Sequence, residues 1–270
     1  MVSYLALTVR FTGNKMISYD MSNEDYHNSV GISKSGLDLI AVSPAHFDAS
    51  FKYKRKSIPA FLIGSAAHCA VLEANEFDDR YGCLDADKRT KAGKEAHEYF
   101  RQSGKESLTP FEYDMVMNIQ KSVWTHPLAK NLLQNGNPEV SCLERRNGVH
   151  VRARADYLRK DGIIVDLKTT QSASENEFAN SVAKFNYHRQ AAWYMELYRL
   201  AGMDIDNFYF ICVEKEPPYA VAVYELDAFS IQKGSDECTK LLGIYKECLE
   251  KDYWPAYSEE IKTIKLPAWR

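Results

Sequence analysis

Residues 152–170 read RARADYLRKDGIIVDLKTT, and this stretch decides the fold of the chain. The Asp-Gly dipeptide at 161–162 separates two apolar-rich runs, which is a strong signal for a β-hairpin. Strand side chains alternate with period two, so Asp166 and Lys168 are expected on one face of the second strand. With the carboxylate of Asp156 on the neighbouring strand, they could hold a divalent cation or aim a water molecule at a phosphate.

The composition is that of an ordinary globular protein, with 45% hydrophobic and 26% charged residues in a chain of 270. This length suits one large domain or one domain with an appended subdomain. The net charge of −3 excludes a basic signature over the whole chain but not a basic groove on an acidic body. The six cysteines form no Cys-x-x-Cys pair, which predicts reduced thiols in a cytosolic protein and argues against zinc or iron–sulfur ligation.

No apolar run approaches the ~20 residues of a membrane-spanning helix, so we expect no membrane partner. The first eleven residues are apolar but have no basic region before them and no cleavage site of small residues, which argues against a signal peptide. Residues 1–15 are interpreted as an N-terminal extension of unknown role. Met16 is an alternative natural start, and residues 16–270 are expected to form a single domain.

Hydrophobic periodicity divides the rest of the chain into helices and strands. Residues 16–31 are polar and are expected to be irregular. Helices are predicted over 33–42, 61–76, 109–124, 126–134, 183–201 and 228–250, with a further helix opening near 87–94. Strands are predicted over 139–146, 149–158, 163–169, 207–213 and 219–226. The first three strands are joined by tight turns and form an antiparallel meander, so the fold class is α/β with a central mixed sheet flanked by helices.

Phosphodiester hydrolysis requires that the phosphate charge be neutralised and that a water molecule be aligned and deprotonated. Asp156 and Asp166 would be carboxylate ligands of Mg²⁺, and the backbone carbonyl of Leu167 is a further oxygen. Lys168, beside the metal, could orient or deprotonate the water. Glu139 begins the first strand of the meander and could add a carboxylate at its edge.

His68 follows the small residues of the Gly64-Ser-Ala-Ala segment on a predicted helix. Small residues allow close approach to another backbone, which would bring the imidazole into the interior. A lone helical histidine is more often a core residue than a ligand, unless its helix packs over the face of Asp156 and Asp166. As a ligand, His68 would suit Mn²⁺ better than Mg²⁺.

Two short basic segments could contact phosphate groups. A loop as short as the first is more often simply solvated, whereas the two interpretations are equally good for the second. The first contains Lys52, Lys54 and Arg55, and the second contains Arg89, Lys91 and Lys94. The second segment opens a helix, whose N–H groups also favour an anion.

The spacing Asp156…Asp166-Leu-Lys168 resembles the core of the PD-(D/E)xK nucleases, with a restriction-endonuclease-like fold. The Gly-x-x-x-His motif ending at His68 and the motif Gln190-x-x-x-Tyr194 resemble additions of the RecB-like branch. Further motifs resemble the nuclease domain of the RecE family, exodeoxyribonuclease VIII, and cover nearly all of the chain from Met16. These are YDMSNEDYH (19–27), ISKS (32–35), GSAAHCAVLE (64–73), RTKAGK (89–94) and Trp254-Pro255.

The resemblance implies a Mg²⁺-dependent exonuclease that degrades the 5′ strand of linear duplex DNA from its ends and leaves a 3′ single-stranded overhang. It also implies a ring-shaped homo-oligomer, tetrameric in that family, a RecT-like annealing protein as partner, and a bacterial or phage-encoded cytoplasmic protein. The matching positions are His68, Asp156, Asp166 and Lys168 for metal and catalysis, Glu139 or its competitor Glu144 for the further carboxylate, and Gln190 and Tyr194 for support of the site and contact with DNA. Both basic segments would then lie along the DNA path.

Two other hypotheses stay open at this point. The chain could be another RecB-like nuclease with different polarity or with single-strand specificity. It could also be a non-catalytic module that binds DNA ends. Cleavage of end-labelled DNA distinguishes another RecB-like nuclease from the 5′-strand exonuclease. Binding of Mg²⁺ or Mn²⁺ distinguishes a nuclease from the non-catalytic module.

Overall fold

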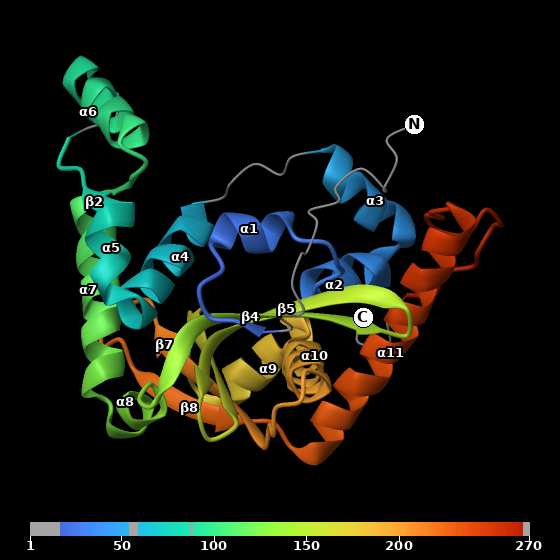
Figure 1. Ribbon diagram of the computed structural model, residues 1–270. Helices are drawn as coiled ribbons and strands as arrows, with labels where there is room; N and C mark the ends of the chain where they lie inside the picture. Colours follow the sequence, from blue (N-terminus) through green and yellow to red (C-terminus); the bar gives the residue numbers. More distant parts are fainter. Residues whose placement is uncertain (1–16, 54–58, 87–88, 267–270) are drawn as a thin grey trace.

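The computed structural model describes residues 17–53, 59–86 and 89–266. Within these ranges, eleven helices surround a central sheet (Figure 1). The predicted extension 1–15 lies outside the described residues. The helices are α1 (Asn23–Asn28), α2 (Lys34–Val42), α3 (Pro44–Lys52), α4 (Pro59–Leu72), α5 (Ala74–Arg80), α6 (Lys91–Gln102), α7 (Pro110–Thr125), α8 (Pro127–Leu132), α9 (Glu175–Phe185), α10 (Tyr187–Leu200) and α11 (Ala228–Lys251).

The central sheet has six strands in the order β1-β4-β5-β6-β7-β8. Its strands are β1 (Ile17–Ser18), β4 (Gly136–Arg146), β5 (Val149–Arg159), β6 (Ile163–Thr170), β7 (Asn207–Glu214) and β8 (Val221–Glu225). Strands β4, β5 and β6 form the antiparallel meander, and β7 runs parallel to β6. This confirms the predicted α/β class with a mixed sheet.

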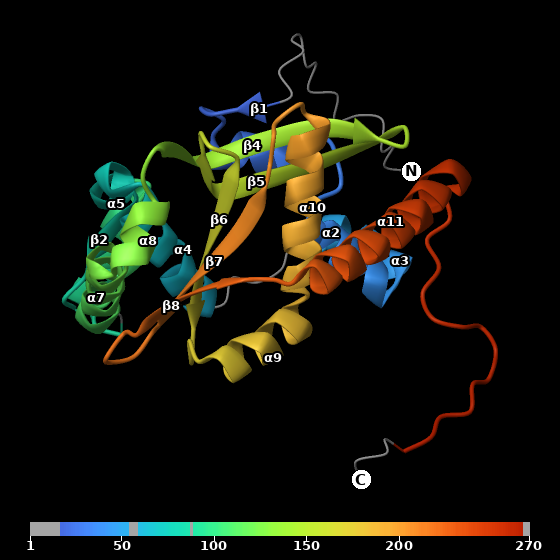
Figure 2. The same cartoon turned by 90° about the horizontal axis from the view of Figure 1, so that it is seen from below.

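The hairpin of β5 and β6 opens toward the candidate site. The strands pair at Tyr157–Val165 and Leu158–Ile164, and beyond these pairs they cross at a wide angle (Figure 2). Continuing the same register would place Asp156 opposite Asp166. The two acidic residues therefore lie in the fork between two diverging strands.

Alternation along β6 divides the core into two layers. Ile164 belongs to a cluster with Trp193 and Tyr198 of α10, whereas Val165 and Leu167 belong to a cluster with α4, α7 and α8. The even-numbered positions of β6 therefore face α10, as the period of two predicts. Tyr198 is completely buried, and its hydroxyl accepts a hydrogen bond from the backbone N–H of Ala155, which ties α10 to β5.

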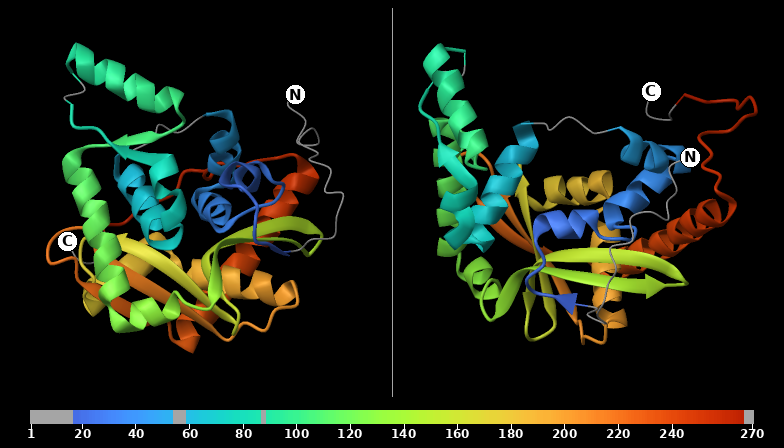
Figure 3. Two further views of the ribbon diagram at one scale, coloured as in Figure 1. Left: turned by 60° about the vertical axis from the view of Figure 1, so that its left-hand side comes forward. Right: turned by 45° about the horizontal axis from the view of Figure 1, so that its top comes forward.

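A helical lobe lies beside the sheet. It contains α4, α5 and α7 and a two-stranded parallel sheet of β2 (Tyr81–Cys83) and β3 (Glu106–Leu108). Helix α6 projects from the end of this lobe, away from the central sheet (Figures 1 and 3). These two short strands were not predicted, because a strand of three residues is too short to show a period in its sequence.

Three of the predicted segments were wrong: two predicted helices are each interrupted, and one segment predicted to be irregular contains a helix. The segment 61–76 is broken at Glu73, whose backbone leaves the helical region (φ −128°, ψ 47°) and whose carboxylate pairs with Arg80 at 2.7 Å. The segment 183–201 is broken at Asn186, which adopts the left-handed conformation that asparagine tolerates. The segment 16–31 is not irregular, because Ser22 caps helix α1 and Tyr26 is buried.

All six cysteines are free, as predicted, and five of them are buried. Within the described ranges, the helices are too short or too polar to cross a membrane.

Helix α11 packs closely on α10 at Gly234, and this contact supports a prediction. A Cβ atom at Gly234 would lie 2.3 Å from the carbonyl oxygen of His188, whereas one at Gly243 would enter open space. We expect Gly234→Ala to lower the free energy of unfolding by about 2 kcal/mol, because overpacking outweighs the gain in helix propensity. The matched variant Gly243→Ala should raise it by up to about 1 kcal/mol. Urea unfolding measures both, and equal effects of the two variants would contradict the close packing.

Candidate active site

Asp166 and Lys168 occupy the face of β6 that packs against α10, where Gln190 contacts both. The Lys168 Nζ lies 2.6 Å from Asp166 Oδ2 and donates to Gln190 Oε1 at 3.1 Å. The Gln190 amide nitrogen donates to Asp166 Oδ1. The side chain of Asp166 is 1% exposed and that of Lys168 is 17% exposed. Each buried charge is therefore stabilised by the opposite charge and by one neutral amide.

Asp156 connects this ion pair to helix α4. Its Oδ2 accepts a hydrogen bond from the Leu167 N–H at 2.9 Å and lies 3.4 Å from His68 Nδ1. Ala66 and Ala67 of α4 are completely buried, which lets this helix approach the sheet closely. The structure thus places His68 over the acidic fork, and in this position a helical histidine is better suited to be a ligand than a core residue.

Glu139 lies on the neighbouring strand β4, opposite Asp156. The flanking pairs Pro138–Tyr157 and Val140–Ala155 set this register. Glu139 has a φ of +52°, which is uncommon for a residue other than glycine and is typical of functional sites. Its carboxylate accepts a hydrogen bond from Arg154 Nε at 2.5 Å. The competitor Glu144 pairs with Val151 further along the strand, so the structure brings Glu139 into the site and leaves Glu144 outside it.

His68, Glu139 and Asp156 could together hold a metal ion, since one donor atom of each lies within 4.8 Å of the others. Burial and the Asp166 carboxylate raise the pKa of Asp156 to about 8. Burial and Asp156 raise the pKa of Glu139, while burial and Lys168 lower the pKa of His68. These three side chains are partly buried. A set of two carboxylates and one imidazole fits a divalent cation, and the charge of the cation would stabilise both carboxylates in their ionised forms.

Asp166 stands outside this group of three among the described residues, since its carboxylate is engaged by Lys168 and Gln190. Leu167 lies beside it and contacts His68 through a backbone hydrogen bond. Burial acts to lower the pKa of Lys168, but Asp166 and Asp156 outweigh this effect and raise it. Lys168 is therefore an ammonium group here, and its predicted role as a base requires that the carboxylate charge be neutralised first.

Tyr187 and Arg154 also belong to the site, although they were not among the predicted site residues. The Lys168 Nζ lies 4.6 Å from the centre of the Tyr187 ring, a cation–π contact. Tyr187 precedes Gln190 by three positions on α10, so helical spacing could have indicated it. Arg154 precedes Asp156 by two positions on β5, so strand alternation places both side chains on one face.

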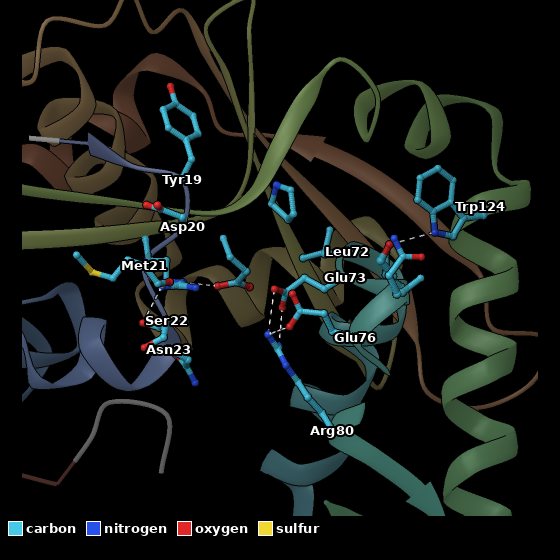
Figure 4. A pocket seen from close by; sticks show the side chains of 16 residues that line it. Tyr19, Asp20, Met21, Ser22, Asn23, Leu72, Glu73, Glu76, Arg80 and Trp124 are labelled. Atoms are coloured by element: carbon cyan, nitrogen blue, oxygen red, sulfur yellow. Dashed lines mark hydrogen bonds and ion pairs between the residues drawn. The ribbon is translucent and has the colours of Figure 1, made fainter. Parts of the chain in front are cut away.

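Two cavities adjoin the site, and Arg154 lines both. The first, here called the acidic cavity, has a volume of about 660 Å³ and is lined by residues that include Asp20, Glu73, Glu76 and Glu139 (Figure 4). The second, here called the basic cavity, has a volume of about 430 Å³. Its lining includes Lys34, Arg152, Gln190 and Tyr194, so the predicted pair Gln190 and Tyr194 faces this second space.

The predicted DNA-binding residues stay a prediction. Lys52 is exposed and forms an ion pair with Asp48 within helix α3, and Lys54 and Arg55 lie outside the described residues. Arg89, Lys91 and Lys94 are exposed at the start of the projecting helix α6, and Lys91 Nζ lies 3.9 Å from Glu95. The second segment therefore lies on the helical lobe rather than beside Asp156 (Figure 1).

The sequence of residues 33–267 matches the family described as a PDDEXK-like domain of unknown function (DUF3799). The chain belongs to this family. The match confirms the PD-(D/E)xK part of the prediction, while membership of the RecE family stays a prediction. No curated protein matches the chain.

Two solved structures are similar to this member of the PDDEXK-like family. One is a protein from Eubacterium rectale named as a candidate exonuclease, 15% identical, with a TM-score of 0.65 over 93% of this chain and 96% of the other. The other is a phage-related exonuclease from Haemophilus somnus 129PT, 14% identical, with a TM-score of 0.37 over 83% and 97%. The first similarity confirms the fold. Family and fold together support a nuclease.

Proposed function

We propose that the protein is a Mg²⁺-dependent exodeoxyribonuclease that acts on the ends of linear double-stranded DNA. It removes the 5′ strand and leaves a 3′ single-stranded overhang for recombination by strand annealing. The observation that carries the nuclease proposal is the buried Asp166–Lys168 ion pair beside the donors of His68, Glu139 and Asp156. Burying charged groups is energetically costly, and such groups cluster at sites that bind a metal or perform a reaction.

Each residue has a role in this proposal. His68, Glu139 and Asp156 would hold the metal, with Asp166 and the Leu167 carbonyl as the further predicted ligands. Mg²⁺ suits the oxygen donors, and Mn²⁺ can substitute for it because Mn²⁺ accepts imidazole more readily. When bound, the metal supplies positive charge that neutralises the scissile phosphate.

The other side chains act on the ion pair and on the substrate. Lys168 orients the attacking water. It would accept the proton of that water only in its neutral form, once a bound cation has offset the charge of the neighbouring carboxylates. Gln190 holds Lys168 and Asp166 in their relative positions. Tyr194 lines the basic cavity one helical turn beyond Gln190 and would contact the DNA.

The proposed assembly rests on the RecE resemblance. The protein would form a ring-shaped homo-oligomer, a tetramer, through which duplex DNA is threaded. A RecT-like single-strand annealing protein would receive the product, in the cytoplasm of a bacterium or a phage-infected cell. A ring explains how a slightly acidic protein could remain on DNA. The residues that contact the phosphates would line the inside of the ring, so the outer surface need not be basic.

Digestion of linear duplex DNA labelled at either the 5′ or the 3′ end tests the function and the polarity. With Mg²⁺ present, the 5′ label is expected to be released at once as a small product, while the 3′ label stays in a long single strand. Early release of the 3′ label would reverse the proposed polarity. Absence of cleavage with either Mg²⁺ or Mn²⁺, in protein that binds DNA ends, would instead favour the non-catalytic module.

Metal binding should depend on pH through Asp156. Its folded-state pKa of about 8 lies above the ordinary value of ~4, so between these values the folded protein holds a proton that the unfolded chain releases. The metal-free protein should therefore lose stability as the pH rises through this window. Because Mg²⁺ displaces that proton, we expect it to raise the Tm more at about pH 8 than at about pH 6.

Thermal unfolding with and without Mg²⁺ measures this effect, and Asp156→Asn is the control. That variant has no carboxyl proton to lose, so it should show neither the pH dependence nor most of the Mg²⁺ effect. An equal Mg²⁺ shift at both pH values would contradict the role of Asp156.

A further inference from the structure

The basic cavity differs from the acidic cavity in charge. Lys34, Arg152 and Arg154 line the basic cavity. Lys34 is paired with Asp38 at 2.8 Å and Arg154 with Glu139 at 2.5 Å, so Arg152 is the cation of the described lining that has no carboxylate partner. The acidic cavity is lined by four carboxylates, and Arg80 forms ion pairs with two of them, Glu73 and Glu76. A phosphodiester that reaches the site is therefore favoured at Arg152 over the acidic cavity, where four carboxylates outnumber the two arginines of the described lining.

Arg152 is the decisive residue of the basic cavity. Its Nη1 donates to the carbonyl oxygens of Tyr26 (2.6 Å), His27 (3.0 Å) and Ser29 (2.7 Å), which are neutral acceptors. Its Nε is buried and has no hydrogen-bond partner within the described part of the chain. Burial also lowers the pKa of this guanidinium. A half-buried cation held by neutral oxygens is costly and would gain from an anionic partner.

Aromatic rings accompany these cations. The Tyr26 ring lies 5.1 Å from the Arg152 guanidinium and 5.5 Å from that of Arg154. Phe51 lines the same cavity. Its ring contacts the Phe47 ring edge to face at a centroid distance of 5.0 Å, and the residue is 65% exposed. An exposed aromatic ring beside basic side chains is the combination that binds single-stranded nucleic acid, since bases stack on the ring while the phosphates meet the cations.

We propose that the basic cavity binds one unpaired nucleotide of the DNA strand being cut, with its phosphate at Arg152 and its base against Phe51. This proposal rests on the proposed function, because the cavity continues to Gln190 and Tyr194 of the candidate active site. A base stacked on Phe51 cannot pair with the opposite strand, so the substrate is a DNA end that has opened locally. The volume of about 430 Å³ lies within the range of pockets for small ligands.

The test measures coupling between Phe51 and a single base. Fluorescently labelled DNA hairpins with a short 5′ or 3′ overhang are bound to the full-length protein in EDTA, so that no cleavage occurs, at one salt concentration. An abasic site is then moved along the overhang and the terminal base pairs. At one position, the abasic site should weaken binding to the wild-type protein by about fivefold or more. In Phe51→Ala, the same abasic site should have no further effect.

Phe229→Ala provides the matched control, since Phe229 is 75% exposed on α11 and lines neither cavity. This variant should keep the full abasic effect. Additive effects of Phe51→Ala and the abasic site at every position would overturn the stacking of a base on Phe51. Equal affinity for a blunt end that is cross-linked against opening and for an overhang would overturn the requirement for an unpaired nucleotide.

Failure of this proposal is distinct from failure of the proposed nuclease. A protein that degrades duplex DNA but shows no coupling retains the nuclease function and loses the nucleotide site. A protein that shows the coupling but cleaves no DNA retains the site and loses the catalytic assignment.

Discussion

Lys168→Met is expected to reduce the initial rate of nucleotide release from linear duplex DNA by about 10³-fold or more. Lys168 is the one cation within contact of Asp166 Oδ2 among the described residues, and it lies in the fork formed with Asp156. Its loss removes both the group that orients the water and a positive charge that would face the scissile phosphate, two contributions that each amount to about 10²-fold or more in other enzymes. Methionine keeps the length of the side chain and removes the charge.

Lys160→Met is the matched control, because Lys160 is exposed in the turn of the same hairpin. This variant should keep the wild-type rate. Activity within tenfold of the wild type in Lys168→Met would show that the lysine has no role in the chemistry, and the site would then have to be assigned to other residues.

Lys168→Met is also expected to lower the free energy of unfolding by about 3 kcal/mol, because it leaves the Asp166 carboxylate buried without its ammonium partner. Asp166 is 1% exposed, so water cannot replace that partner. The double variant Asp166→Asn, Lys168→Met removes both charges and should recover most of the lost stability, since an asparagine amide can still accept the hydrogen bond from Gln190.

Urea unfolding of the wild type, both single variants and the double variant gives the coupling energy of the pair. The double variant should be stable and inactive, which separates the loss of chemistry from the loss of folding. A double variant that is less stable than Lys168→Met alone would show that the two side chains do not form a stabilising pair.

The sequence predicted the elements whose signals are local. Asp-Gly at 161–162 indicated the hairpin, alternation along 163–168 placed Asp166 and Lys168 on one face, and helical spacing paired Gln190 with Tyr194. Each of these signals follows from the regular period of a helix or a strand, so it can be recognised without knowing which residues pack against that element. The breaks at Glu73 and Asn186 were missed, because ion pairing with Arg80 and a left-handed backbone interrupt a helix without changing its apolar pattern.

The sequence by itself therefore determined the mixed α/β fold, the hairpin and the residue types of a metal-dependent site. The tertiary structure alone decided that β5 and β6 diverge at Asp156, that Glu139 rather than Glu144 faces it, and that α4 brings His68 to the same carboxylate. It also decided that Asp166 is held by Lys168 and Gln190 and that a cavity lined by Arg152 adjoins them. The physical reason is that these features depend on the twist between strands and on contacts between residues far apart in sequence, which no local period records.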